Sequence, residues 1–470
     1  MTFSELKIIF DGQFAHEVEK WRRRNQYYYN DILRLLRFSV AEGSSVLQVG
    51  NDDGWAVDAL NPSRGVCVTM SEALAREGEK KFKGVEFVVD MHEDRLTLNE
   101  KFDYIVLINS IGGAPDLQSY FARLAPVVKP STRVIITYYN YLWQPIIRMA
   151  EALGLKQKLP IQHWLSSIDI NNILTLTGFE VIKEGRRMLL PKYVPILSEF
   201  FNEVLGRLPL IDRFCFCNYV IARPCLTCAV DAPCSVSVIV PARNERGTIE
   251  ALVKRVPDMG SWTEIIFVEW GSTDGTWEEI KRVYEAYHDK RRIKIFQYET
   301  PNKGDKVRKG FEEAQGDILM VLDSDLSVPP ECLSRFYQVI ASGLAEYAHG
   351  NRLIYPMEKE AMRFLNLVAN KFFSFAFSWL LKQRLKDTLC GTKVLLREGY
   401  RKLAKNRKYF GDFDPFGDFD LVFGASKLAL KMIEIPVHYK ERVYGKTNIS
   451  RFRHGWLLLK MLVFAMRKFE

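Results

Sequence analysis

Two successive series of short apolar runs, separated by segments of helical pattern, constrain the fold of this chain more than any other feature. The runs lie at 46–50, 65–69, 85–89, 104–109, 133–139, 178–185 and 217–224, and then at 236–240, 264–269, 294–299 and 317–323. Apolar runs of strand length suit strands buried on both faces, and the intervening helical segments suit the crossovers of a parallel sheet. The sequence therefore predicts two α/β units, preceded by an amphipathic helical lead-in over 13–38.

Residues 224–235 separate the two series. This segment, PCLTCAVDAPCS, contains two prolines and no periodicity, which is typical of a connection rather than of a helix or strand. A chain of 470 residues is also too long for one comfortable core. We therefore predict a first domain over 1–224, a linker over 225–234 and a second domain over 235–470.

In the second series, a polar cluster follows each predicted strand. The clusters comprise Pro241, Asn244 and Glu245; Glu269, Ser272 and Asp274; Lys303 and Gly304; and Asp323 and Asp325. Ligands of open parallel sheets bind at the carboxyl ends of the strands, where loops and helix N-termini present unpaired N–H groups. The order of the clusters predicts one ligand site along this edge of the sheet.

The side chains in these clusters favour a nucleotide ligand. Asp323 and Asp325, two positions apart, could hold a divalent cation, because hard oxygen ligands suit Mg²⁺ or Mn²⁺. Lys303, Lys306 and Arg308 supply positive charge for phosphate oxygens, which a leaving nucleoside diphosphate needs as its bond breaks. A single aspartate pair is also common in solvated loops, so the inference depends on all four clusters together.

From about residue 235 to 455 the sequence resembles the family 2 glycosyltransferases, in particular those that act on polyprenyl phosphates. The resemblance is carried by V-P-x-x-N-E at 240–245, by E-W-G-S-T-D-G-T at 269–276 where the family has D-D-G-S-x-D-G-T, and by the D-x-D pair. It continues in G-N-R at 350–352, D-T-L-C-G-T-K at 387–393 and E-I-P-V at 434–437, followed by R-V-Y-G-K-T at 442–447. The resemblance implies a GT-A fold and an inverting transfer from a nucleotide-sugar donor.

The same resemblance implies roles for individual residues. Asp323 and Asp325 would position the metal and the diphosphate, and Arg442, Lys446 and Thr447 would bind the acceptor phosphate. The nucleotide would be bound by Pro241, Asn244, Glu245, Glu269, Ser272, Asp274, Lys303, Gly304 and Arg352. If the acceptor were a hydroxyl instead, Asp418 or Asp420 would be the base. Glu269 and Trp270 replace the first two aspartates of the family pattern, so the nucleotide is left unnamed.

Two apolar segments, 360–382 and 450–470, correspond to membrane-surface helices of the related polyprenyl-phosphate enzymes. The aromatic residues there suit an interfacial helix with its flanking lysines, Lys371 and Lys382; they are Phe372, Phe373, Phe375, Phe377 and Trp379. Packing on the sheet or on the other domain is the alternative. No stretch of about 18 residues is free of charge, and we read no signal peptide. The net charge of +9 favours anionic partners but does not select among them. From the family resemblance we expect a cytoplasmic protein, peripheral on an anionic membrane face, with no nucleic-acid partner.

The first half resembles the class I S-adenosylmethionine-dependent methyltransferases, which have a Rossmann-like fold, over residues 25 to 224. In that family a glycine-rich loop follows the first strand, and an acid after the second strand holds the ribose. Here Gly50 and Gly54 flank Asp52 and Asp53, the second strand ends at Thr69 without an acid, and Asp90 remains for the adenine. S-adenosylmethionine is thus a doubtful ligand, and we expect weak binding or none.

Three alternatives stay open from the sequence. The chain could be bifunctional, with an active methyltransferase domain and a sugar hydroxyl as the glycosyl acceptor. It could be a methyltransferase whose second domain only binds sugar nucleotides, or a membrane scaffold without catalysis. The intact D-x-D pair and the lysine cluster argue against the last two, because neither needs metal ligands.

Overall fold

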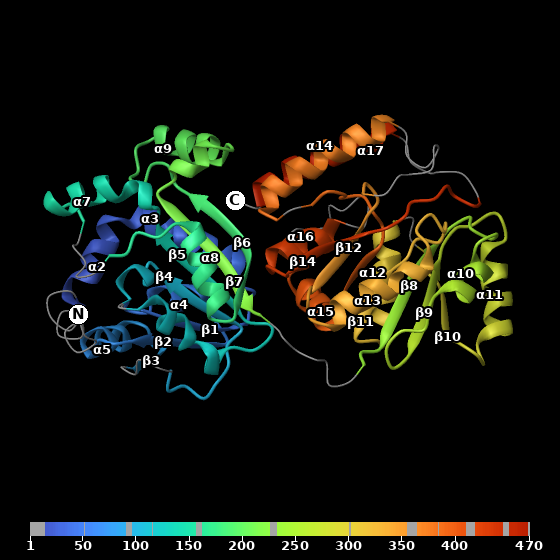
Figure 1. Cartoon of the computed structure of the whole chain (residues 1–470), viewed down its shortest axis with the longest axis horizontal. Helices are drawn as coiled ribbons and strands as arrows, with labels where there is room; N and C mark the ends of the chain where they lie inside the picture. The colour runs from blue at the N-terminus through green and yellow to red at the C-terminus, as the bar shows by residue number, and fades with distance from the viewer. Residues whose placement is uncertain are drawn as a thin grey trace. The chain divides into compact units, whose positions relative to one another are not determined.

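The computed structural model describes residues 15–50, 52–90, 96–114, 116–156, 162–225, 233–299, 302–354, 364–383, 385–409, 419–444 and 451–468. The chain divides into two compact units, Met1–Cys225 and Leu226–Glu470 (Figure 1). Each unit is built on one seven-stranded sheet with its own hydrophobic core.

The N-terminal sheet has the strand order β3-β2-β1-β4-β5-β7-β6. Its strands are β1 (Ser45–Val49), β2 (Arg64–Thr69), β3 (Glu86–Val89), β4 (Tyr104–Ile108), β5 (Arg133–Tyr139), β6 (Phe179–Arg187) and β7 (Cys217–Pro224). Neighbours are parallel except for β7, which runs antiparallel to both β5 and β6. The strands predicted from the apolar runs in this half are confirmed.

Two helices of this unit precede β1, and its other helices lie between successive strands. In chain order, the helices are α2 (Ala15–Arg24), α3 (Gln26–Ser39), α4 (Trp55–Leu60), α5 (Glu72–Lys81), α6 (Leu117–Ala122), α7 (Gln144–Ala152), α8 (Ser167–Leu176) and α9 (Leu197–Glu199). Short turns of helix are η2 (Ile111–Gly113), η3 (Ala125–Val127), η4 (Tyr141–Trp143), η5 (Phe200–Val204), η6 (Leu205–Arg207) and η7 (Ile211–Phe214). The predicted helical lead-in is confirmed and consists of α2 and α3. The two helices are separated by a turn at Asn25, whose side chain donates to the Trp21 carbonyl (2.9 Å).

The C-terminal sheet has the order β10-β9-β8-β11-β13-β12-β14. Its strands are β8 (Val236–Ala242), β9 (Thr263–Glu269), β10 (Arg292–Gln297), β11 (Ile318–Val321), β12 (Tyr347–Asn351), β13 (Lys393–Leu396) and β14 (Met432–Pro436). All pairs are parallel except those of β13, which is antiparallel to β11 and β12. The first four strands are those expected from the sequence, and every residue of β8 and β11 is buried.

Most helices of the C-terminal unit lie beside this sheet (Figure 1). The helices of the unit are α10 (Ile249–Arg255), α11 (Thr276–Tyr287), α12 (Lys303–Glu313), α13 (Leu333–Ala341), α14 (Phe364–Leu381), α15 (Arg397–Lys405), α16 (Phe419–Lys427) and α17 (Arg451–Lys468), with η8 (Pro330–Cys332) and η9 (Arg407–Tyr409). Helices α14 and α17 pack against each other and lie together at one end of the unit (Figure 1). In the part of the chain that the structure describes, no helix is long and apolar enough to span a bilayer.

Candidate functional site

The carboxyl ends of β8, β9 and β11 bring four of the sequence-predicted clusters together. Parallel pairing sets Ala242 beside Glu269 and Val321 beside Ile239, so the loops that follow these strands share one edge of the sheet. At that edge, Lys303 at the start of α12 reaches the loop after β11, where its Nζ lies 2.6 Å from Oδ1 of Asp323. Asn302 caps the same helix by accepting a hydrogen bond from the Gly304 N–H (2.9 Å).

Asp325 is held in place from two sides. Its Oδ1 accepts hydrogen bonds from the backbone N–H (3.0 Å) and the hydroxyl (2.7 Å) of Ser327. Its Oδ2 lies 3.0 Å from Nη2 of Arg442, whose Nη1 is 3.1 Å from Oε1 of Glu245. Arg442, predicted to bind the acceptor phosphate, therefore bridges carboxylates from the loops after β8 and β11.

The carboxylate of Asp323 occupies a space that only a glycine leaves open. A Cβ atom on Gly391 would lie 2.0 Å from Oδ2 of Asp323, well inside van der Waals contact. Burial alone would raise the pKa of Asp323, but Lys303, Lys393 and Arg352 outweigh it and hold the pKa below its usual value. Asp323 is therefore ionised at neutral pH.

Glu245 is the buried carboxyl of this cluster. Only 4% of it is exposed, and burial raises its pKa to about 7, against the opposing effect of Arg442. Its Oε2 is buried and has no hydrogen-bond partner among the residues that the structure describes. Oε2 of Glu245, beside Asp325, can therefore accept a hydrogen bond from a ligand.

The loops after β8 and β9 are locked together by hydrogen bonds. The Asn244 N–H donates to the Ser272 hydroxyl (3.0 Å), and the Thr273 N–H donates to Oδ1 of Asn244 (2.8 Å). The Glu245 N–H donates to the Thr276 hydroxyl (2.9 Å), which in turn donates to Asp274. These predicted nucleotide-site residues thus shape the loops themselves.

Glu269 and Trp270, the departure from the family pattern, have distinct surroundings. The Glu269 carboxylate is buried and accepts from the Ser272 N–H (2.9 Å) and the Gln297 amide (3.1 Å). The Trp270 ring has two cations near it, with the guanidinium carbon of Arg243 5.0 Å and Nζ of Lys306 6.0 Å from its centroid. Arg243 was absent from the sequence prediction, and its only signal was a basic side chain inside the first cluster.

Other predicted site residues interact with protein groups outside the cluster described above. Arg352 is buried and donates to both oxygens of Asp387 (2.7 and 2.8 Å). Asp420 pairs with Arg308 (3.1 Å) and Arg407 (3.3 Å), and the Pro241 carbonyl accepts from Ser324 (3.1 Å). Asp418, Lys446 and Thr447 lie outside the described residues.

This donor set fits a divalent cation. The carboxylates of Asp323 and Asp325 follow β11. Arg442 links Asp325 to Glu245, whose Oε2 has no hydrogen-bond partner among the described residues. Within the described ranges, no group of three or more histidine, cysteine, aspartate or glutamate side chains could hold a metal by itself. A cation here would need further oxygen ligands, such as those of a diphosphate.

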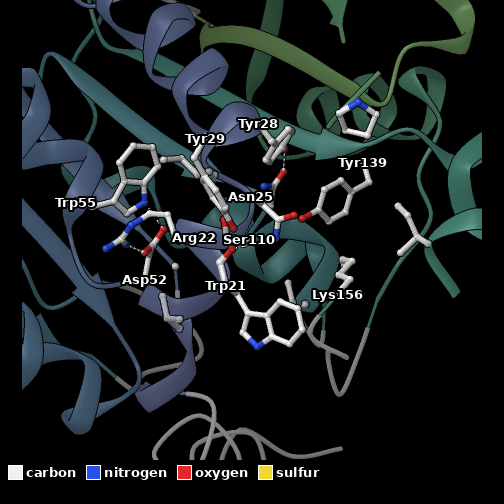
Figure 2. Close-up of a pocket in the computed structure, with 18 of the residues that line it drawn as sticks. Trp21, Arg22, Asn25, Tyr28, Tyr29, Asp52, Trp55, Ser110, Tyr139 and Lys156 are labelled. Atoms are coloured by element: carbon white, nitrogen blue, oxygen red, sulfur yellow. Dashed lines mark hydrogen bonds and ion pairs between the residues drawn. The ribbon is translucent and has the colours of Figure 1, made fainter. Parts of the chain in front are cut away.

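The N-terminal unit contains a cavity of about 380 Å³ at the carboxyl ends of β1, β2 and β4 (Figure 2). Gly50 (φ +148°) and Gly54 (φ +78°) shape the loop after β1. Between them, Asp52 accepts a hydrogen bond from the Trp55 indole (3.0 Å) and lies 3.6 Å from Arg22, as Figure 2 shows. Burial and the neighbouring Asp53 raise the pKa of Asp52 to about 7.

The residues of this cavity do not fit S-adenosylmethionine well. Thr69 ends β2 where an acid would hold the ribose, and its hydroxyl already accepts from the Ser71 N–H (3.2 Å). Asp90 accepts from the N–H (2.7 Å) and the hydroxyl (2.9 Å) of Thr97, with Arg123 at 3.8 Å. Asp90 is thus engaged by protein groups, and Thr69 offers a single hydroxyl in place of a carboxylate. The Asp52 side chain lines the cavity where the family has a glycine.

Known relatives match each unit separately. Residues 237–404 match the family model of glycosyl transferase family 2, and residues 21–184 match that of a methyltransferase domain. A dolichol-phosphate mannosyltransferase of Pyrococcus furiosus is 29% identical over 48% of this chain and 64% of its own length. An undecaprenyl-phosphate 4-deoxy-4-formamido-L-arabinose transferase of Pectobacterium carotovorum is 25% identical over 46% of this chain and 63% of its own.

Among solved structures, glucosyl-3-phosphoglycerate synthase of Mycobacterium tuberculosis superposes with a TM-score of 0.37 at 17% identity, over 50% of this chain and 78% of that one. The chain spans less than two thirds of the length of the two enzymes named above. The two matched ranges and the two sheet orders confirm the predicted fold class. The chain therefore joins an N-terminal methyltransferase domain of Rossmann-like fold to a C-terminal family 2 glycosyl transferase domain of the GT-A fold.

Proposed function

We propose that this protein transfers a sugar from a nucleotide-sugar to a polyprenyl phosphate at a membrane surface. The observation that carries the proposal is the ion-paired cluster of Lys303, Asp323, Asp325, Arg442 and Glu245 at the carboxyl edge of the sheet. It supplies carboxylates for a cation and fixed positive charges for phosphates, which a transfer from a nucleoside diphosphate to a phosphate requires.

Each residue has a role in this proposal. Asp323 and Asp325 would hold Mg²⁺ or Mn²⁺, which neutralises the diphosphate as it leaves. Lys303 reaches the same carboxylate and offers a second positive charge to the departing oxygens. Arg442 would exchange its present carboxylate partners for the acceptor phosphate, which attacks the anomeric carbon from the side opposite the diphosphate.

A phosphate acceptor agrees better with the surroundings of Asp420 than a hydroxyl does. A phosphate is already anionic near neutral pH and needs no strong base. The Asp420 carboxylate is engaged by the guanidinium groups of Arg308 and Arg407, so it is not placed to accept a proton from an acceptor hydroxyl. The observation therefore favours the phosphate over the sugar hydroxyl.

In this proposal, helices α14 and α17 contact the cytoplasmic face of a membrane. Phe373 and Phe377 are buried, whereas Phe372 (53%) and Phe375 (68%) are exposed on the same helix. On α17, Trp456 is 60% exposed, with basic residues in the last turn. Apolar and aromatic side chains fringed by cations suit the interface of an anionic bilayer.

The transfer is tested with the full chain, polyprenyl phosphate in detergent, a panel of nucleotide-sugars and Mn²⁺, with lipid products identified by mass spectrometry. Lys303→Ala should reduce the rate by about two powers of ten, because it removes a positive charge from the leaving group. Lys309→Ala, on the same helix and paired with Glu313, is the matched control. Product formed only on sugar hydroxyls, or no product from any donor, would overturn the proposal.

A further inference from the structure

The N-terminal unit carries an apolar surface that its own fold leaves exposed. It is formed by the exposed side chains of 141–155, on η4 and α7, and of 193–214, on α9 to η7; we call it the α7–α9 surface. The two segments adjoin, because the Trp143 indole donates to the Phe214 carbonyl (2.8 Å). Figure 1 shows α7 and α9 along the same side of this unit.

Helix α7 displays the pattern most clearly. Ile147 is buried, while Ile146, Met149 and Leu153, spaced three and four residues apart, are 49%, 58% and 65% exposed. A helix that borders water normally presents polar side chains on its outer face. The outer stripe of α7 is apolar instead, which indicates that something other than water covers it.

The α7–α9 surface continues into the cavity of the N-terminal unit. Ile146 and Leu155 are half exposed and also line the cavity, together with Trp143. Lys156 and Lys192 line it as well. The mouth of the cavity is thus bordered by apolar side chains and lysines.

The charges around the surface are mainly basic. Segments 15–24, 141–156 and 190–214 together contain nine lysines and arginines and six aspartates and glutamates. Local ion pairs involve both signs: Glu151 pairs with Lys156 (2.7 Å), Asp212 with Arg186 (3.2 Å), Glu19 with Arg23 and Arg22 with Asp53. The excess of basic over acidic side chains remains. A basic fringe around aliphatic and aromatic side chains complements an anionic lipid surface.

We infer that the α7–α9 surface docks the N-terminal unit on an anionic lipid bilayer. This contact is separate from the one proposed for α14 and α17, and it does not depend on which sugar or acceptor the other unit uses. It sets the mouth of the N-terminal cavity at the lipid interface.

Hydrogen–deuterium exchange of the full chain, with and without vesicles, tests the inference. With vesicles containing about one third phosphatidylglycerol, we expect exchange in peptides covering 141–156 and 193–214 to slow by roughly tenfold, since binding shields their amides. Helix α8 carries exposed Ile168 (71%) and Leu176 (70%) outside this surface, and its exchange should not change.

Charge substitutions locate the contact. The substitutions are made in a Trp456→Glu background, which weakens the contact proposed for α14 and α17. In that background, the double variant Met149→Glu with Leu153→Glu should bind vesicles about tenfold more weakly than Trp456→Glu alone. Ile168→Glu with Leu176→Glu is the matched control and should bind as that background does. Unchanged binding by the α7 variant would overturn the inference.

Two exchange results would also overturn it. Exchange in 141–156 that vesicles do not slow, at any protein concentration, would show that the bilayer does not cover this surface. Protection that grows with protein concentration alone would show that a second copy covers it. Either would rule out the bilayer as the occupant.

Discussion

Replacing Gly391 with alanine tests whether the position of the Asp323 carboxylate controls transfer. The backbone of Gly391 does not lie in the left-handed region, so alanine adds no backbone strain. The added Cβ would lie 2.0 Å from Oδ2 of Asp323 and 2.7 Å from its Cγ. The substitution therefore acts on one carboxylate.

The size of the effect follows from these distances. Carbon and oxygen atoms in van der Waals contact need about 3 Å or more, so Oδ2 must retreat by about 1 Å. That movement disturbs the 2.6 Å ion pair with Lys303 and any cation held by Asp323. A misplacement of about 1 Å costs roughly 100-fold in rate.

The assay is the initial rate of lipid-linked product, with the melting temperature measured on the same sample. Gly391→Ala should lose roughly 100-fold in rate, while overpacking lowers stability by about 1–3 kcal/mol at most. Gly399→Ala is the control, because its Cβ would meet nothing closer than 3.7 Å, and it should transfer at the original rate. Transfer by Gly391→Ala at more than half that rate would refute the reasoning.

Three further predictions concern the metal, the N-terminal cavity and the core. Asp323→Asn or Asp325→Asn should abolish transfer in a folded protein, as should EDTA; full activity in any of these would remove the metal from the mechanism. Calorimetry should give a dissociation constant for S-adenosylmethionine above about 10 μM, because losing a hydrogen bond to a charged group costs roughly 1.5–3 kcal/mol; tighter binding would contradict this. Asp387→Ala should destabilise the protein by about 3–5 kcal/mol and lower its melting temperature by roughly 10 °C, because Arg352 stays buried without its carboxylate; an unchanged melting curve would argue against it.

The Arg352–Asp387 pair also gives stability a pH dependence. Burial alone would raise the pKa of Asp387, but Arg352 outweighs it and holds the pKa well below its usual value. A carboxyl with a depressed pKa stabilises the fold fully above its unfolded pKa, about 4. Its contribution therefore declines as the pH falls below that value, which acid titration of melting temperature should detect in the native protein and not in Asp387→Asn.

Local sequence pattern determined the strands of the first sheet, strands β8 to β11 of the second, the two-unit organisation and the order of the polar clusters, but not β12, β13 and β14. Strands buried on both faces must be continuously apolar, so β8 and β11 could be recognised from their runs alone. Motif spacing then located the loops that follow them, because a loop begins where the apolar run ends. The helical lead-in expected over 13–38 is confirmed by α2 and α3, although periodicity alone did not reveal the turn at Asn25 that separates them.

Only the tertiary structure decided which partner each charged side chain has. The sequence assigned Arg352 to the nucleotide and Arg442 to the acceptor, yet Arg352 pairs with Asp387, and Arg442 bridges Glu245 and Asp325. Nothing in the pattern of α7 as a sequence shows that its apolar stripe faces outward. Pairing and exposure depend on contacts between residues far apart in the chain, and those contacts exist only after the sheet and its loops have assembled.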